Sequence, residues 1–197
     1  MFPAQFEYYE AGSVDDALSL LAEHGDREVE LLAGGHSLLP TMKSGLASPD
    51  ALIDIGGIDD LRGIERNGDA FSIGALTPYA EVAANDAMTR DATAFAEAAK
   101  AIGDIQVRNR GTVGGNIAHS DPASDLPAAV VASDATITVQ GDGGTREVAA
   151  DDFFMGMYET DVGEGEILTG VEVPTLDDGD VGAYVKKPSP SSGYAMV

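Results

Sequence analysis

The sequence predicts an α+β protein built as two lobes, and three observations support this class. The 197 residues are 44% hydrophobic, which is enough to bury a core in one domain or two small ones. Segments with strand character outnumber those that a regular strand–helix alternation supplies, so a doubly wound sheet fits less well. An acidic, glycine-bearing stretch at 175–182 indicates a linker late in the chain.

The first predicted lobe, residues 1–56, is a small β-α-β unit. Ser13 begins a capping-box-like pattern, and apolar residues at helical spacing then predict a helix that ends at Gly25. Short apolar runs predict buried strands over 29–33 and 51–55.

The second predicted lobe, residues 57–176, begins with a strand over 70–75. Thr77-Pro78 offers a hydroxyl cap followed by proline at the first helical position, so a helix is expected to start there. An alanine-rich segment predicts a second helix over 93–102, and Leu, Ala and Val residues predict a third over 126–132.

The end of this lobe reads as strands. Residues 136–140 alternate Thr, Ile, Thr and Val, and the Gly-Asp-Gly-Gly turn at 141–144 leads to a strand around 146–149. A further strand over 166–173 stops at a proline. Residues 177–197 are then expected to begin with a linker.

Charge and composition exclude several classes of function. With 34 Asp and Glu against 11 Lys and Arg, the net charge is −23, which disfavours nucleic acid or an anionic membrane as partner. An acidic surface of this kind is typical of a halophilic protein, whose self-repulsion salt screens. The N-terminus lacks signal-peptide character and no run approaches 18 apolar residues, so we expect a cytoplasmic protein without membrane insertion.

Catalytic chemistry from this chain alone is equally restricted. There is no cysteine, which excludes thiolate nucleophiles and cysteine-bound metal clusters, and the three histidines form no metal-ligand pair. Gly-x-Gly-x-x-Gly, the P-loop pattern and Gly-x-Ser-x-Gly are all absent. We therefore expect no catalytic residue and no metal site on this polypeptide.

Two glycine clusters carry the strongest signal for a ligand. They are Ala33-Gly34-Gly35-His36-Ser37 after a strand, and Thr112-Val113-Gly114-Gly115-Asn116. Paired glycines let backbone N–H groups converge on one anion, so the two clusters predict a pyrophosphate site that needs no lysine or arginine. A plain turn is the alternative for either cluster alone. Asp125 reads as a helix N-cap or as an acceptor for ribose or adenine, and His36 and His119 as loop hydrogen-bonders or acid–base groups.

The same segments resemble a known family. Met-Phe-Pro-x-x-Phe-Glu-Tyr at the start, Leu-Ala-Gly-Gly-His-Ser-Leu-Leu-Pro over 32–40 and Ile-Gly-Asp-Ile-Gln-Val-Arg-Asn-Arg-Gly-Thr-Val-Gly-Gly-Asn over 102–116 are its motifs, followed by Asp-Pro-Ala-Ser-Asp over 121–125. Together they make the chain similar to the FAD-binding (medium) subunit of molybdenum hydroxylases, and most like the carbon monoxide dehydrogenase branch.

The resemblance implies a two-lobed fold of the molybdopterin dehydrogenase flavoprotein type, with FAD between the lobes. It also implies that 177–197 is the linker and the start of a C-terminal domain that is largely missing. It places Ala33, Gly34, Gly35, His36, Ser37, Thr112, Val113, Gly114, Gly115 and Asn116 around the pyrophosphate. It also places Asp125 at the ribose or adenine end, Ile102 and Leu168 on apolar faces near the flavin, Lys186 near the isoalloxazine or pyrophosphate, and Tyr194 beside the flavin.

The resemblance also implies partners. The molybdenum cofactor belongs to a large subunit and two [2Fe–2S] clusters to an iron–sulfur small subunit, from which electrons pass through FAD to an external acceptor. The alternatives are a truncated flavin-free assembly module, a stand-alone flavin oxidoreductase, or a xanthine- or aldehyde-type subunit in place of the carbon monoxide type.

Overall fold

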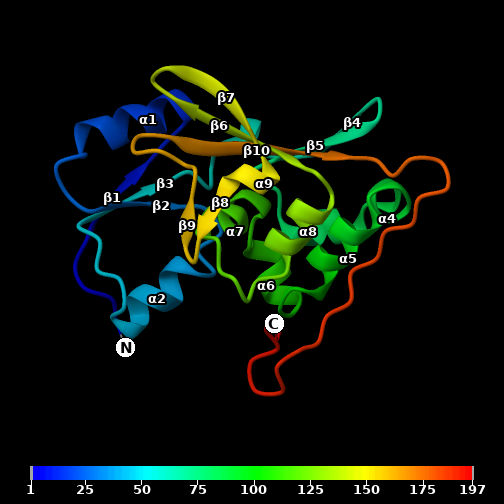
Figure 1. Ribbon diagram of the computed structural model, residues 1–197. Coiled ribbons are helices and arrows are strands. Elements are labelled where there is room, and N and C mark those ends of the chain that lie inside the picture. The colour runs from blue at the N-terminus through cyan, green and yellow to red at the C-terminus, as the bar shows by residue number, and fades with distance from the viewer. Residues whose placement is uncertain (1, 197) are drawn as a thin grey trace.

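A three-stranded parallel sheet and a five-stranded antiparallel sheet organise the chain (Figure 1). The structure, a computed structural model, describes residues 2–196. Helices and strands are mixed, and the strands of the larger sheet are not joined by a regular helix alternation. The predicted α+β class is therefore confirmed.

The parallel sheet is built from the N-terminal residues. Its elements are β1 (Glu7–Glu10), α1 (Val14–Glu23), β2 (Val29–Leu32), α2 (Leu38–Ser44) and β3 (Ala51–Asp54). The strand order is β1-β3-β2, so β1 and β2 lie on opposite sides of β3. The sequence patterns did not predict β1. Figure 1 shows α1 and α2 on opposite sides of this sheet.

Capping and burial explain why α1 forms where the sequence predicts it. The Ser13 side chain accepts a hydrogen bond from the Asp16 N–H at 3.1 Å, which satisfies one free donor of the first turn. Ala17 and Leu18 then turn into a small core with residues of β3. Leu76 and Ile167, which lie beyond this N-terminal unit in the sequence, also enter this core, so the two parts are packed together.

The antiparallel sheet has β10 at its centre. The strand order is β4-β5-β10-β6-β7, and β10 pairs with β5 on one side and β6 on the other. The elements, with the short helix that precedes them, are η1 (Asp59–Leu61), β4 (Ile64–Asn67), β5 (Ala70–Gly74), β6 (Thr136–Gly141), β7 (Gly144–Ala149) and β10 (Ile167–Pro174). The strand predictions for 70–75, 136–140, 146–149 and 166–173 are confirmed to within one or two residues at each end.

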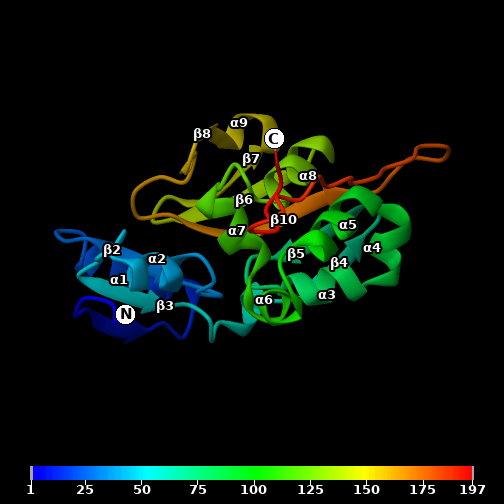
Figure 2. The same ribbon diagram turned by 90° about the horizontal axis from the view of Figure 1, so that it is seen from below.

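Helices cover one face of this sheet, beneath it in Figure 1. Their bounds, with those of a short hairpin that follows them, are α3 (Tyr79–Ala84), α4 (Asp86–Asp91), α5 (Thr93–Ala101), α6 (Ile105–Arg110), α7 (Val113–His119), α8 (Leu126–Ala132), α9 (Ala150–Phe153), β8 (Phe154–Gly156) and β9 (Glu159–Thr160). Phe71, Phe95 and Phe153 are fully buried in the main core between these layers. Figure 2 shows the N-terminal sheet set to one side of this layered body.

The prediction that the Thr77 hydroxyl caps a helix is wrong. α3 begins at Tyr79, and Thr77 does not cap it. The Thr77 hydroxyl instead accepts from the Gly63 N–H and donates to the Gly63 carbonyl, both at 3.0 Å. Thr77 is fully buried, so its hydroxyl takes the nearest backbone partners inside the protein and none at the helix end.

Residues 175–196, the C-terminal strap, contain no helix or strand and cross the helical layer. Figure 1 shows the strap running down past α4 and α5 and ending near α6. It is fixed by hydrogen bonds from the Leu176 N–H to the Asp91 carbonyl, from the Tyr184 N–H to Glu97, and from the Ala195 N–H to the Ala123 carbonyl. Among residues 2–196, none of the helices has the length and apolar character that a membrane span requires.

Candidate functional site

Two adjoining cavities lie between the N-terminal sheet and the helices of the larger part. The larger cleft has a volume of about 520 Å³ and the smaller cavity about 210 Å³. Five residues line both, so the two spaces are continuous: His36, Ser37, Tyr79, Asn116 and His119. Volumes of this size are typical of cofactor and small-ligand sites.

Nearly all residues that the sequence singled out line this space. The larger cleft is lined by Ala33, Gly34, Gly35, His36, Ser37, Thr112, Gly114, Gly115, Asn116 and Leu168. The smaller cavity is lined by Ile102, Asp125, Lys186 and Tyr194. Val113 lines neither, because its side chain is fully buried in the main core and its N–H donates to the Thr77 carbonyl.

The first glycine cluster supplies free backbone donors. It follows β2 directly and leads into α2, and the N–H groups of residues 34–37 donate to no acceptor among residues 2–196. Gly35 has a φ of +72°, which turns the chain so that successive N–H groups face one region. Since these residues line the larger cleft, they offer an anion a set of neutral donors there.

Close packing explains why residue 34 is also a glycine. A Cβ on Gly34 would collide with the carbonyl oxygen of Arg110 and would lie 3.0 Å from the Gly111 Cα. The loop after β2 therefore touches the backbone just before the second glycine cluster. This contact brings the two clusters together across a separation of more than seventy residues in sequence.

The second cluster is the first turn of a helix, and the expected loop is absent. Thr112 is the N-cap of α7, its hydroxyl accepting from the Gly115 N–H at 3.3 Å. The expectation that both glycine N–H groups face a pyrophosphate is wrong for Gly114, whose N–H donates to the Ala75 carbonyl at 2.8 Å. A Cβ on Gly114 would lie 2.5 Å from the Ala75 Cβ, so this glycine is needed for packing.

Gly115 occupies a different environment from its neighbour. It is exposed to the cleft, and a Cβ there would meet the Thr112 hydroxyl at 2.7 Å and the Ala33 Cβ at 3.6 Å. No backbone atom blocks that position, so a ligand can approach the helix terminus closely because the side chain is missing. Gly115 is thus the glycine of this pair that shapes the cleft.

A partly buried polar network joins the two cavities. The Asn116 side-chain amide donates to the Tyr79 hydroxyl at 3.0 Å, and the Ser124 hydroxyl donates to the Asn116 side-chain oxygen at 2.8 Å. Burial raises the pKa of Tyr79 to about 12, so its phenol stays protonated at neutral pH. Tyr79 was not predicted as a site residue, since nothing in its local sequence marks it.

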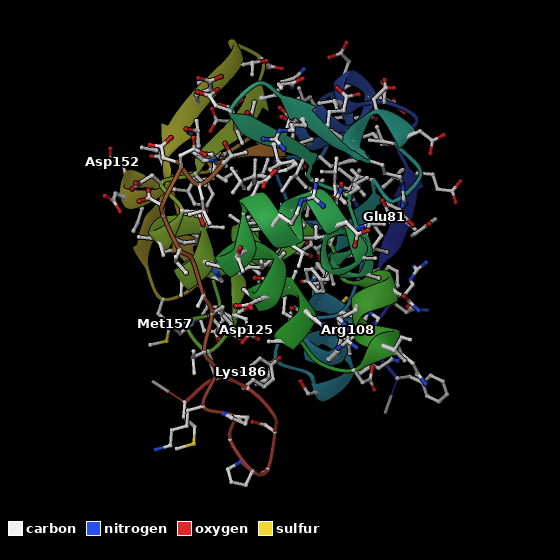
Figure 3. The ribbon with its side chains drawn as sticks, turned by 90° about the vertical axis from the view of Figure 1, so that its right-hand side faces the viewer. Glu81, Arg108, Asp125, Asp152, Met157 and Lys186 are labelled. Atoms are coloured by element: carbon white, nitrogen blue, oxygen red, sulfur yellow. The ribbon has the colours of Figure 1, made fainter. Side chains whose placement is uncertain are left out.

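The Asp125–Lys186 pair forms the wall of the smaller cavity. The Lys186 ammonium donates to the Asp125 carboxylate at 2.8 Å and to the Ala101 carbonyl at 3.1 Å, and the Tyr184 hydroxyl donates to Asp125 at 2.7 Å. Asp125 and Lys186 are 4% and 12% exposed at their side chains. Figure 3 shows the two labelled side chains close together where the strap passes α8.

This pair bears on two sequence-based expectations. Asp125 stands at the N-cap position of α8, but its side chain makes no capping bond because the strap's residues take it. The 2.8 Å contact also puts Asp125 and Lys186 side by side at one wall of the smaller cavity. Which end of FAD each of them meets stays a prediction.

Apolar and aromatic residues complete the walls. Leu168 precedes a β-bulge at Leu168/Gly170, which turns β10 at the cleft, while Ile102 ends α5 beside the smaller cavity. Tyr194 is half-exposed, and burial raises its pKa above the usual range. His119, considered as a loop residue, lies in the last turn of α7 with its ring 5.2 Å from that of Tyr158.

Tyr158 and Glu166 also line the larger cleft, although sequence reasoning passed over both. Glu166 is held by the Arg146 guanidinium through two hydrogen bonds of 2.8 and 2.6 Å, which lower the pKa of the carboxyl to about 2. Arg146 also pairs with Asp161. The loop before β10 is thereby tied to β7.

Comparison with known proteins identifies the class that this fold and cleft define. Residues 4–176 match the family described as the FAD binding domain in molybdopterin dehydrogenase. The chain belongs to this family, as the sequence resemblance predicted. The two-lobed fold of that flavoprotein type follows, and FAD is the cofactor of the domain.

Individual relatives are medium chains of dehydrogenases. The carbon monoxide dehydrogenase medium chain of Hydrogenophaga pseudoflava is 45% identical over 186 residues, which cover 94% of this chain and 64% of the relative. The glyceraldehyde dehydrogenase medium chain of Sulfolobus acidocaldarius is 40% identical, with 100% and 69% covered. The chain thus spans about two thirds of the length of these relatives.

Solved structures agree with this assignment. A carbon monoxide dehydrogenase of Hydrogenophaga pseudoflava, lacking the Mo-pyranopterin moiety of its cofactor, matches with a TM-score of 0.95 and 44% identity over 99% of this chain and 68% of that one. Quinoline 2-oxidoreductase from Pseudomonas putida 86 matches with a TM-score of 0.84 and 30% identity over 89% and 61%.

Proposed function

We propose that this chain is the FAD-binding redox subunit of a molybdenum hydroxylase and that FAD occupies the two joined cavities. The observation that carries the proposal is the convergence of both glycine clusters on one cleft, with four free backbone N–H groups at residues 34–37. We further propose that residues 1–56 and 57–176 are the two lobes flanking the cofactor and that 177–197 is the linker and the start of a C-terminal domain.

The donor chemistry of the cleft fits a pyrophosphate. Backbone N–H groups, together with the open space at Gly115, can hold a doubly negative group without Lys or Arg. Such a site suits a chain of net charge −23 that has few basic residues. Ser37, Thr112 and Asn116 add neutral hydroxyl and amide groups around the same cleft. These residues hold and orient the diphosphate. His36 lines both cavities, so the ligand passes from one to the other beside it.

The smaller cavity suits one polar ring edge of the cofactor. Asp125 offers a carboxylate and Lys186 an ammonium within one hydrogen-bonded pair, while Ile102 supplies an apolar face. A ring that carries both N–H and C=O groups on one edge matches this donor and acceptor set. Asp125 and Lys186 therefore fix the orientation of that ring, and the buried pair keeps water away from it.

Bound FAD supplies the redox chemistry, and the protein supplies binding, orientation and electrostatics. We infer that electrons arrive from two [2Fe–2S] clusters of a small subunit, to which a molybdenum-containing large subunit passes them, and that they leave to an external acceptor. The identities of 45% and 40% favour a carbon monoxide dehydrogenase and, second, an aldehyde-oxidising enzyme such as the glyceraldehyde dehydrogenase.

Anaerobic reduction of the flavin tests this division of labour. The FAD-loaded chain is mixed with carbon monoxide, with glyceraldehyde and, as a positive control, with dithionite. Only dithionite is expected to bleach the flavin. Adding the small and large subunits is expected to make bleaching by one of the substrates fast. Bleaching by a substrate without partners contradicts the subunit role, and a chain that takes up no FAD supports the flavin-free assembly module.

A further inference from the structure

The β8–β9 hairpin places an aromatic side chain at the edge of the larger cleft. Tyr158 lies in the tight connection between β8 and β9, lines the cleft and is 55% exposed as a residue. The neighbouring Met157 is 72% exposed and does not line it. In Figure 3 the Met157 side chain points away from the molecule.

The backbone at Tyr158 is held in an unfavourable conformation. Its φ is +58°, a left-handed value that a bulky residue rarely adopts. The Tyr158 N–H donates to the carbonyl of Ser120 at 3.1 Å, and Ser120 is itself left-handed with a φ of +49°. The Ser120 hydroxyl reaches back to the Gly156 carbonyl. Strain of this kind persists where the surrounding structure enforces it, and it clusters at ligand sites.

This backbone directs the ring onto the cleft side of α7. The rings of Tyr158 and His119 are 5.2 Å apart and tilted by 50°. His119 lies four residues after Gly115 on the same face of α7, which is about 6 Å along the helix axis. The Tyr158–His119 pair therefore stands one helical turn along α7 from the glycine that shapes the proposed pyrophosphate site, and both rings line the same cleft.

We propose that Tyr158 is a stacking residue for FAD, whose ring packs on one of the two flat heterocycles of the cofactor. The inference rests on the proposed function. The isoalloxazine and the adenine lie at opposite ends of the pyrophosphate, so a ring that lines the cleft next to the pyrophosphate site can contact one of them. An aromatic face that is half-exposed at a cleft, and backed by a second ring, gains stability when a flat ring covers it. The strained hairpin keeps that face in place before the cofactor arrives.

Substitutions at Tyr158 separate the ring from the backbone. Tyr158→Asn removes the ring while keeping a residue that tolerates left-handed φ, so the hairpin is expected to fold. Tyr158→Phe keeps the ring without the hydroxyl. Met157→Ala is the matched control on the same hairpin. Titrations of the full chain with FAD, FMN and ADP, each checked by far-UV circular dichroism, give the dissociation constants.

The asparagine variant is expected to bind FAD about tenfold more weakly than the wild type, while the phenylalanine and Met157→Ala variants bind it normally. If FMN is also weakened and ADP is not, the ring packs on the isoalloxazine. If ADP is weakened and FMN is not, it packs on the adenine. Wild-type affinity in the asparagine variant, or an equal loss in Met157→Ala, overturns the role of Tyr158. A wild-type chain that binds no FAD instead refutes the proposed function.

Discussion

Adjacent glycines in α7 are expected to respond in opposite ways to the same substitution. In Gly114→Ala the new Cβ lies 2.5 Å from the Ala75 Cβ and 2.8 Å from its Cα. Backbone cannot move aside cheaply, so this overpacking is expected to cost about 2–3 kcal/mol, which exceeds the gain of about 1 kcal/mol from alanine over glycine inside a helix. The net loss of about 1–2 kcal/mol lowers the Tm of a protein of this size by about 2–8 °C.

Gly115→Ala is expected to leave the fold intact and to weaken the binding of FAD. Replacing glycine inside a helix gains about 1 kcal/mol. The new Cβ lies 2.7 Å from the Thr112 hydroxyl, whose displacement forfeits a cap worth about 1 kcal/mol. These terms cancel, so the Tm is expected to stay within about 4 °C of the wild type. The added methyl group blocks the close approach of the cofactor, and affinity is expected to fall at least about tenfold.

Calorimetry and FAD titration of both variants measure the two effects. Gly143→Ala is the matched control, because a Cβ there meets nothing within 4 Å and the site lies in the β6–β7 turn. It is expected to change neither quantity. A Gly115→Ala protein with wild-type FAD affinity refutes the reasoning. So does a Gly114→Ala protein that is as stable as the wild type, because the contact with Ala75 then has no consequence.

Three further predictions follow from the charges. Asp125→Ala leaves the Lys186 ammonium buried without its carboxylate partner, a change that costs about 3–5 kcal/mol. The strap is therefore expected to detach, and trypsin is expected to cleave after Lys186 much faster than in the wild type. The hydrogen bonds of Arg146 lower the pKa of Glu166 from 4.5 to about 2. Their contribution to stability is therefore fully present above pH 4.5 and is lost as the pH falls through about 2. Over this pH window the Tm of the wild type is expected to drop more steeply than the Tm of Glu166→Gln. The charge of −23 predicts a Tm that rises between about 0.1 M and 2 M KCl, and a flat profile contradicts a halophilic surface.

Local sequence patterns predicted the elements whose reasons are local. The helix over 126–132 and the strand over 136–140 were found because apolar periodicity and turn residues act within a few positions. β1 was missed because its residues, Glu-Tyr-Tyr-Glu, are largely exposed and show no buried face. α7 was missed because two glycines disfavour a helix, and the contact with Ala75 overrides that preference.

The site was predictable where the residue type itself carries the signal. Both glycine clusters could be found because paired glycines mark unusual backbone, and Asp125 because an acid before Leu126-Pro127 marks a helix start. The distance of 61 residues between Asp125 and Lys186 hid their pairing, which depends on the path of the strap. Tyr158 gave no local signal, since its left-handed backbone is imposed by Ser120 from another element.

Direct titration of the purified chain with FAD tests the central claim, which is that the two joined cavities hold this cofactor. Isothermal calorimetry is expected to show one FAD bound per chain, with flavin absorption retained after desalting. Gly115→Ala is expected to lose that binding at unchanged far-UV circular dichroism. A folded wild-type chain that binds no FAD, or one that binds it equally well after Gly115→Ala, contradicts the account.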